Sequence, residues 1–286
     1  MKNIMKWVTL ATLLLVAACS TNAGTETNET NEQQATNKEE TNEATADKDS
    51  EEAQGEASEE PKDKEEEVVT EENATPEYRL NEAIWGFEPI NDAPEEAVLL
   101  TIDDAPDENS VEMAKTLKEL DAPAIFFVNG HFLDTEEEKA RLKEIHDMGF
   151  AIGNHTMSHS DLKTLSEEEQ REEIVKLSDL IEEIIGEKPE FFRAPFGSNT
   201  DYSKSLVKEE GMLLMNWTYG YDWEKQYQEK AALTDIMVNT PLLQNGANLL
   251  MHDRDWTAAA LEDIVTGLRE KDFSLIKPEE IEPLQK

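Results

Sequence analysis

Two pairs of side chains in this 286-residue sequence, His155 with His159 and Asp103 with Asp104, could together bind a metal ion and activate a water molecule beside it. His155 and His159 lie four positions apart, so on a helical turn both imidazoles would project from one face toward one ion. That spacing alone more often marks two surface histidines. Asp104 would add a carboxylate, and two histidines with one carboxylate leave coordination positions open, as catalytic Zn²⁺, Co²⁺ or Fe²⁺ requires.

The neighbouring acid, Asp103, is a candidate general base. Adjacent residues of a strand point to opposite faces, but just past a strand end Asp103 and Asp104 can diverge. One carboxylate would then reach the ion and the other a water molecule beside it, which is the usual arrangement for a general base. The alternative is a pair of solvated turn acids in the segment Asp-Asp-Ala-Pro.

The elements that must position these groups alternate along the chain beyond Tyr78. We expect strands at Ala97–Ile102, Ala124–Val128, Phe150–Gly153, Phe191–Ala194, Met212–Trp217, Asn248–Met251 and Phe273–Ile276. We expect helices at Glu108–Leu120, Thr135–Met148, Ser166–Ile185, Tyr202–Glu210, Ala231–Leu243 and Trp256–Lys271. This alternation predicts an α/β fold with a parallel sheet. Seven strands are few for a full eight-stranded barrel of about 250 residues, so periodicity leaves a depleted barrel and a doubly wound sheet both open.

Polar side chains follow five of the expected strands at their carboxyl ends. They are Asp103-Asp104, Asn154-His155, Arg193, Tyr221-Asp222-Trp223 and His252-Asp253. Active sites of parallel α/β proteins are built at that edge of the sheet. We therefore expect these residues to form one site.

Five segments resemble, in order, the motifs of the polysaccharide deacetylases (carbohydrate esterase family 4, the NodB-homology domain). They are Thr101–Pro106 (Thr-Ile-Asp-Asp-Ala-Pro), His155–His159 (His-Thr-Met-Ser-His), Arg193–Gly197 (Arg-Ala-Pro-Phe-Gly), Asp222-Trp223 and Leu250–Asp253 (Leu-Met-His-Asp). The family fold is a distorted (β/α) barrel with fewer than eight strands. The resemblance therefore favours a barrel of about seven parallel strands over the open sheet.

The resemblance implies a role for each motif residue on the metal side of the site. Asp104, His155 and His159 would bind one divalent ion, Zn²⁺ first, with Co²⁺, Fe²⁺, Ni²⁺ and Mn²⁺ as alternatives. Asp103 would take a proton from the activated water that attacks an acetamide carbonyl. Arg193 would pair with Asp103 and orient it.

The resemblance also implies how the other motifs would handle the substrate. His252 would protonate the departing sugar amine, with Asp222 holding the imidazole in its charged form. The backbone N–H of Phe196 would help to hold the oxyanion. Trp223 and Leu250 would wall a small apolar pocket for the acetyl methyl group.

Three positions depart from the usual motifs. Ala105 replaces a glycine, so the first loop can take a different path, because glycine tolerates backbone angles that alanine resists. Phe196 replaces a common tyrosine, but the oxyanion role needs only its backbone. Ile102 replaces a phenylalanine in the core. None of these changes removes a group that performs chemistry, so we expect an active enzyme.

The first 18 residues have the pattern of a secretion signal. Met1–Lys6 is basic, and Trp7–Ala18 is an uncharged apolar run that is too short to span a bilayer. Val16-Ala17-Ala18-Cys19 resembles a bacterial lipobox, in which the cysteine is lipidated and becomes the new N-terminus. The resemblance implies a lipid anchor on Cys19 and a place at the extracellular face of the cell membrane. Ordinary secretion is the alternative.

Residues 19–77 are expected to be a disordered acidic linker, and residues 78–286 the catalytic domain. Between Ser20 and Glu77 there are 20 acidic and 4 basic residues and no aromatic residue, so this segment cannot bury enough apolar surface to fold. It carries −16 of the formal net charge of −39. Such acidity argues against nucleic acid as a partner. A single cysteine excludes an intrachain disulfide framework.

These observations predict a metal-dependent hydrolase that removes N-acetyl groups from a surface glycan and acts as a monomer. Peptidoglycan, through N-acetylglucosamine or N-acetylmuramic acid, is the expected substrate because of the anchored location. Chitin-like chains, an exopolysaccharide and a non-carbohydrate acetamide are alternatives. A different class of function, a non-catalytic wall-binding lipoprotein on a deacetylase scaffold, also stays open.

Overall fold

The computed structural model describes residues 75–284, and the expected signal, Cys19 and most of the expected linker lie outside this range. The strands are β1 Tyr78–Asn81, β2 Gly86–Pro89, β3 Ala97–Ala105, β4 Ile125–Val128, β5 Ala151–Asn154, β6 Phe191–Phe192, β7 Leu213–Leu214, β8 Asn248–His252 and β9 Ser274–Leu275. The helices are α1 Ser110–Glu119, α2 Glu136–Asp147, α3 Glu167–Ile185, α4 Asp201–Glu209, α5 Lys230–Asn239 and α6 Asp255–Glu270. All seven expected strands and all six expected helices are present.

Seven strands, β3 to β9, form a curled parallel sheet. Six of them lie in the order β7-β6-β5-β4-β3-β8, and β9 pairs with the start of β3. The segment after β7 joins the sheet's two edges, because Tyr219 forms a parallel bridge with Leu249. Around this bridge, Thr218 N donates to Asn248 O at 2.8 Å, and Leu250 N donates to Tyr219 O at 2.8 Å. This is the predicted distorted (β/α) barrel, closed through one irregular seam.

The inward face of the barrel changes from apolar to polar along the strands. At the amino ends it presents a cluster that includes Ala97, Leu99 and Phe127. Higher on β3 the inward residues become Thr101 and Asp103. Because side chains alternate across a strand, this polar end of the interior lies at the carboxyl edge of the sheet, where a site is expected.

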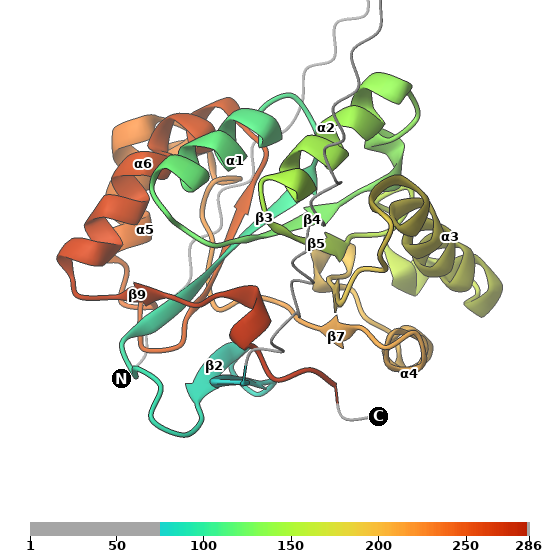
Figure 1. The fold of residues 1–286 in the computed structure, drawn as a ribbon, viewed down its shortest axis with the longest axis horizontal. Coiled ribbons are helices and arrows are strands. Elements are labelled where there is room, and N and C mark those ends of the chain that lie inside the picture. The colour runs from blue at the N-terminus through green and yellow to red at the C-terminus, as the bar shows by residue number, and fades with distance from the viewer. Residues whose placement is uncertain (1–74, 285–286) are drawn as a thin grey trace, which may run out of the picture. The chain divides into compact units, whose positions relative to one another are not determined.

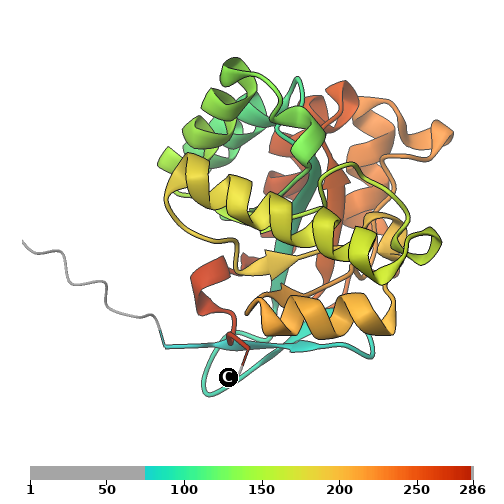
Figure 2. The same cartoon turned by 90° about the vertical axis from the view of Figure 1, so that its right-hand side faces the viewer.

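The antiparallel hairpin β1–β2 closes the amino end of the barrel. Its Tyr78 and Phe87 belong to the same buried cluster, together with Ile281 from the C-terminal segment. Phe87 N also donates to Gly246 O at 2.7 Å, just before β8 begins. The hairpin and the C-terminal segment lie next to each other in Figures 1 and 2.

The helices cover the outer face of the sheet, with α1 and α2 on one side and α3 and α4 following around it (Figures 1 and 2). They bury a second apolar cluster that includes Ile102, Phe126 and Leu261. A capping box begins α3, since the Ser166 hydroxyl accepts from Glu169 N and the Glu169 carboxylate accepts from Ser166 N.

Several expectations about the elements were wrong in detail. β3 does not end at Ile102 but continues through Asp103 and Asp104 to Ala105. α5 ends at Asn239 rather than at residue 243, because Pro241 cannot continue a helix and biases the residue before it to an extended backbone. The hairpin was missed. No helix within residues 75–284 is both long and apolar enough to cross a membrane.

Candidate metal centre and active site

The carboxyl end of β3 presents Asp103 and Asp104 in different directions. The pairing of β3 with β4 shifts register between Ile102 and Ala105, and Asp104 has φ 64°, in the left-handed region. An irregularity of this kind re-aims side chains at the rim of a barrel. The two acids therefore diverge as predicted, but they do so within the strand rather than beyond it.

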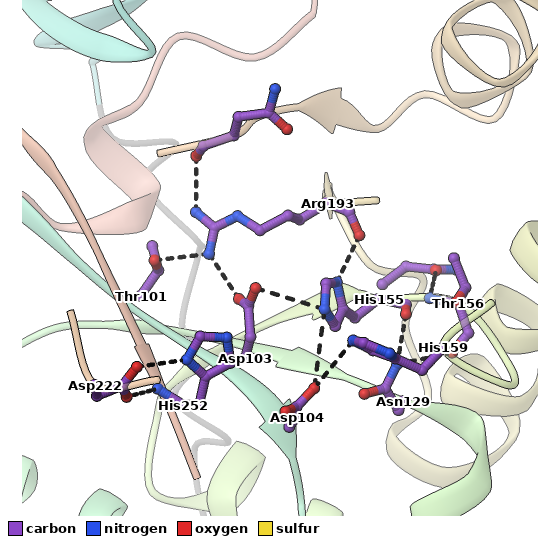
Figure 3. A network of polar contacts seen from close by, with 12 residues as sticks. Thr101, Asp103, Asp104, Asn129, His155, Thr156, His159, Arg193, Asp222 and His252 are labelled. Carbon is purple, nitrogen blue, oxygen red and sulfur yellow. Dashed lines mark hydrogen bonds and ion pairs between the residues drawn. The ribbon is translucent and has the colours of Figure 1, made fainter. Parts of the chain in front are cut away.

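Asp104, His155 and His159 converge on one point (Figure 3), and their ligand atoms all lie within 4.8 Å of one another. Oδ1 of Asp104 lies 4.0 Å from Nε2 of His155 and 3.5 Å from Nε2 of His159. The expected helical turn was wrong, because residues 155–159 form a loop in which Thr156 and His159 have φ of 70° and 57°. Within residues 75–284 this is the one group of three such residues placed to hold an ion.

The chemistry of these donors fits a divalent metal ion. Nδ1–H of His155 donates to the backbone carbonyl of Arg193 at 2.7 Å, which leaves the lone pair of Nε2 facing the carboxylates of Asp103 and Asp104. Burial lowers the pKa of both imidazoles, so both favour the neutral form that binds metal. Burial alone would raise the pKa of Asp104, but the surrounding histidines and Arg254 hold it below its usual value, in the form that binds metal.

Arg193 pairs with Asp103 in the buried interior, as predicted. Its Nη1 lies 2.6 Å from Oδ1 of Asp103, and both side chains are almost fully buried, at 0% and 3% exposed. The same guanidinium donates to Thr101 Oγ1 at 2.8 Å and to the Asn216 carbonyl at 2.9 Å. Burial lowers the pKa of Arg193, and Asp103 opposes that effect.

The aromatic floor beneath Arg193 depends on a glycine. The guanidinium lies 4.3 Å from the ring centroid of Phe127, a distance at which a cation–π attraction operates. The Phe127 ring in turn occupies the space beside Gly153, where an added Cβ would come within 2.5 Å of it. Hydrogen bonds at the edge of the guanidinium group and packing of the Phe127 ring against its face thus fix the position of Arg193.

His252 and Asp222 form the second predicted pair. Nδ1 of His252 lies 2.7 Å from Oδ1 of Asp222, and Oδ2 accepts from His252 N at 2.6 Å and from Thr257 Oγ1 at 2.8 Å. Burial would lower the pKa of His252, but the hydrogen bond and the charge of Asp222 outweigh it and raise that pKa. Nε2 is the ring nitrogen left to donate a proton.

A cavity of about 430 Å³ brings the predicted residues together. Its lining is Asp103, Asp104, His155, His159, Phe196, Trp217, Asp222, Trp223, Leu250, His252 and Arg254. Phe196 has φ 59° and exposes 69% of its surface beside His159, with the two ring centroids 4.9 Å apart. The structure thus collects at one cavity the side chains to which a role was assigned, except Cys19, which lies outside the described residues, and Arg193, which lies beneath Asp103. The expectation that every strand-end polar residue joins the site was wrong for Asn154, Tyr221 and Asp253, which do not line the cavity because other parts of the protein bind their side chains.

Trp223 and Leu250 form an apolar wall, as the resemblance implied. Trp223 lies edge-on to His252, with ring centroids 5.5 Å apart. Gly220 permits this packing, because a Cβ there would lie 2.5 Å from the Leu250 carbonyl oxygen and 2.8 Å from the Trp223 ring.

The sequence interpretation missed Trp217 and Arg254. Trp217 lies in the irregular segment after β7, where strand periodicity is lost. Arg254 donates from Nη2 to Oδ2 of Asp104 at 2.7 Å across 150 positions of sequence. Its only local signal is that it directly follows His252-Asp253, at a strand end.

The comparisons with known proteins agree with the geometry. Residues 90–215 match the family model described as polysaccharide deacetylase. The chain is 30% identical over 220 residues to a peptidoglycan-N-acetylglucosamine deacetylase of Bacillus cereus, a match that covers 73% of this chain and 78% of the relative. It is 31% identical over 165 residues to YlxY of Bacillus subtilis, which has no assigned function, covering 57% of this chain but only half of that relative.

One similar solved structure is of a protein described as lacking activity. It is the wild-type form of a carbohydrate esterase family 4 pseudoenzyme from Bacillus anthracis, with 28% identity and a TM-score of 0.59. The match covers 65% of this chain and 66% of that one. Similar folds therefore occur in proteins described as deacetylases and in a protein described as a pseudoenzyme. The fold alone does not distinguish an active enzyme from an inactive relative, whereas the side chains of the site do.

Proposed function

The chain belongs to the polysaccharide deacetylase family, and on this premise we propose that it is a metal-dependent hydrolase that removes N-acetyl groups from a cell-surface glycan and releases acetate. One observation carries the proposal. Asp103 and His252 are direct neighbours across β3 and β8, each held by its own buried partner, beside a set of three metal-ligating side chains. This places a base, an acid and an ion site at one cavity.

Asp103 is the base of the proposed reaction. Arg193 holds its Oδ1, while Oδ2 lies 3.5 Å from Nε2 of His155 and so faces the ligand set. A divalent ion bound there, Zn²⁺ in our proposal, would act as a Lewis acid, making water more acidic and polarising the amide carbonyl. Oδ2 of Asp103 accepts the proton of the water whose oxygen attacks the acetyl carbonyl carbon.

His252 is the acid. Its Nδ1 is held by Asp222, so Nε2 can give its proton to the amide nitrogen as the C–N bond breaks. The products are a free sugar amine and acetate. The raised pKa of His252 suits this role, because a general acid must carry its proton when the substrate arrives.

The acetyl group needs a place on the cavity wall. Trp223 and Leu250 supply apolar surface for its methyl group, and Phe196 lines the same cavity with its ring beside that of His159. We assign the Phe196 N–H to the developing oxyanion. The role uses the main chain, so the departure from the common tyrosine leaves it intact.

The substrate that we propose is peptidoglycan, deacetylated at N-acetylglucosamine or N-acetylmuramic acid. The name of the Bacillus cereus relative supports this class. Chitin-like chains and exopolysaccharides present the same acetamide, so the sugar has to be settled by assay.

The rival function, wall binding without catalysis, gains weight from the similar pseudoenzyme. Against it stands the completeness of the site, since Asp103, Asp104, His155, His159 and His252 are all present and mutually oriented. A protein selected only to bind would have no need of the buried pairs that hold Asp103 and His252.

Acetate release tests the proposal directly. The full chain would be incubated with N-acetylglucosamine oligomers, N-acetylmuramic acid-containing glycan strands, chitin oligomers and intact peptidoglycan, each with and without a chelator. We expect acetate from at least one peptidoglycan substrate, lost with chelator and restored by Zn²⁺. Bound metal with no acetate from any glycan would support the rival function.

We further propose that Cys19 carries a lipid and holds a monomeric enzyme at the extracellular face of the membrane. The support is the apolar run that ends at the lipobox-like segment Val16–Cys19. Metabolic labelling with palmitate should mark the wild-type chain and not Cys19→Ala. An unlabelled wild-type chain found in the medium would favour ordinary secretion, and size-exclusion chromatography of the detergent-free Cys19→Ala chain tests the monomer.

A further inference from the structure

Arg254 makes a contact to the ligand set that none of the roles above uses. It directly precedes α6, two positions after His252, and its guanidinium lines the cavity with 37% of the side chain exposed. We propose that Arg254 is a positioning residue that holds Asp104 as a metal ligand through one oxygen only. The inference rests on the proposed metal-dependent function and gives a role to Arg254, on which that proposal did not draw.

The two oxygens of Asp104 have separate partners. Oδ1 faces Nε2 of His155 and of His159, whereas Oδ2 accepts a charged hydrogen bond from Nη2 of Arg254 at 2.7 Å. Hydrogen bonds between ionised groups are the strong ones in proteins. With Oδ2 held toward Arg254, Oδ1 is the oxygen that the carboxylate would present to the ion, and binding through Oδ1 alone would leave more coordination positions for water and substrate.

Asp104 needs such a partner because little else holds its side chain. Its backbone is in the left-handed region, where a non-glycine residue is under strain, and it lies in the irregular part of β3. Among residues 75–284, Arg254 supplies the one hydrogen bond that the Asp104 carboxylate accepts. His155, by comparison, is oriented by the carbonyl of Arg193.

Arg254 is itself anchored to the start of α1. Its Nη1 donates to the carbonyl of its neighbour Asp253 at 2.7 Å. The buried Asp253 carboxylate accepts from the backbone N–H of Asn109 at 2.8 Å and of Ser110 at 2.7 Å. A helix N-terminus favours such an anion. A continuous chain of contacts therefore runs from α1 through Asp253 and Arg254 to Asp104.

A different role for Arg254 would be to bind an acidic group of the glycan, because it is a partly exposed cation at the cavity. The observed contacts favour the positioning role, since one N–H of Nη1 and one of Nη2 already donate to oxygens of the protein and turn the guanidinium toward Asp104, whereas three of its five N–H donors have no such bond within residues 75–284. The test separates the two roles, because a substrate contact would alter KM and leave metal binding unchanged.

The experiment measures metal binding in Arg254→Ala and Arg254→Gln. Zn²⁺ affinity would be measured by competition with a chromophoric chelator, and the visible d–d bands of the Co²⁺ protein would report the coordination number. Arg254→Lys, which retains a charged donor, is the rescue variant. Arg171→Ala is the matched control, because this arginine is 53% exposed on α3 and does not line the cavity.

We expect Arg254→Ala and Arg254→Gln to lose metal affinity by about 10–100-fold, the usual effect of removing a residue that orients a ligand. Their Co²⁺ bands should weaken as Asp104 becomes free to bind through both oxygens. Arg254→Lys should recover part of the affinity, and Arg171→Ala should match the wild type.

Unchanged Zn²⁺ affinity and Co²⁺ spectra in both variants would overturn the inference, and a rise in KM for acidic glycans alone would assign Arg254 to substrate binding. If one variant fails to fold, the other and Arg254→Lys give the same comparison. A wild-type protein that binds metal but releases no acetate would refute the proposed function and leave this inference testable. A wild-type protein that binds no metal would refute both.

Discussion

Replacing Asp103 by Asn separates catalysis from metal binding. The change keeps the shape of the side chain and an oxygen that can still accept from Arg193 Nη1, now 2.6 Å from Oδ1. It removes the charge and the proton-accepting oxygen Oδ2. Asp103 is not among the three ligand residues, so the affinity for metal should stay near that of the wild type.

The expected loss of rate exceeds what lost stability can explain. General base catalysis contributes about 10²–10⁴-fold. On the stability side, a hydrogen bond to a charged group is worth about 1.5–3 kcal/mol, and full rupture of a buried pair costs about 3–5 kcal/mol. Asn still accepts a hydrogen bond, so the lower range applies. At about 2–4 °C per kcal/mol for a domain of this size, Tm should fall by about 3–12 °C.

The assay follows acetate release and bound Zn²⁺ at a temperature well below Tm, with urea unfolding as the measure of stability. Asp179→Asn is the control, because Asp179 is 61% exposed and pairs with Lys188 on the surface at 3.4 Å. It should keep wild-type rates. If Asp103→Asn binds metal and turns over at a near-normal rate, Asp103 is not the base and the assignment is refuted.

Three further perturbations test other parts of the site. Asp222→Asn should lower the pKa of His252, because contact with Asp222 raises that pKa in the wild type. The acid acts only when it is protonated, so the alkaline limb of the kcat–pH profile should move to lower pH. An unmoved limb would exclude His252 as the acid. Gly220→Ala should displace Trp223 and cost about tenfold or more in kcat/KM, and a folded variant with normal kcat/KM would show that turnover does not depend on this packing. Prolonged dialysis against chelator should abolish activity and lower Tm through loss of a bound ion, and Zn²⁺ should restore both; activity that survives verified removal of metal would contradict the mechanism.

The regular elements were predictable because their patterns are local. Ala97–Ile102 is apolar at every position except Thr101, and it forms part of a strand that is buried along its whole length. The hairpin was not predictable in the same way, because β1 and β2 have four residues each and only a few of their side chains, chiefly the buried Tyr78 and Phe87, pack against the core. Its position depends on contacts with distant segments rather than on its own periodicity.

The site was predictable to the extent that its residues sit in recognisable motifs. His155 and His159 were paired correctly but for a wrong geometric reason, since a loop with two left-handed residues brings their rings together instead of a helix. Arg254 could not be found, because an arginine beside a motif has no distinctive pattern and its partner, Asp104, is 150 positions away.

The two ends of the described chain meet at the floor of the barrel. Glu77 N donates to Glu280 O at 2.7 Å, and Tyr78 bridges to Ile281, both next to the cluster that seals the amino ends of the strands. The residues of the proposed active site lie toward the carboxyl ends of the strands. A segment joined to either end would therefore leave the domain on the side opposite the cavity. Changes in such a segment need not alter the residues that line the cavity. The termini thus lie at one end of the barrel and the cavity at the other. A long polymer could then approach the cavity without meeting the segments attached to the termini.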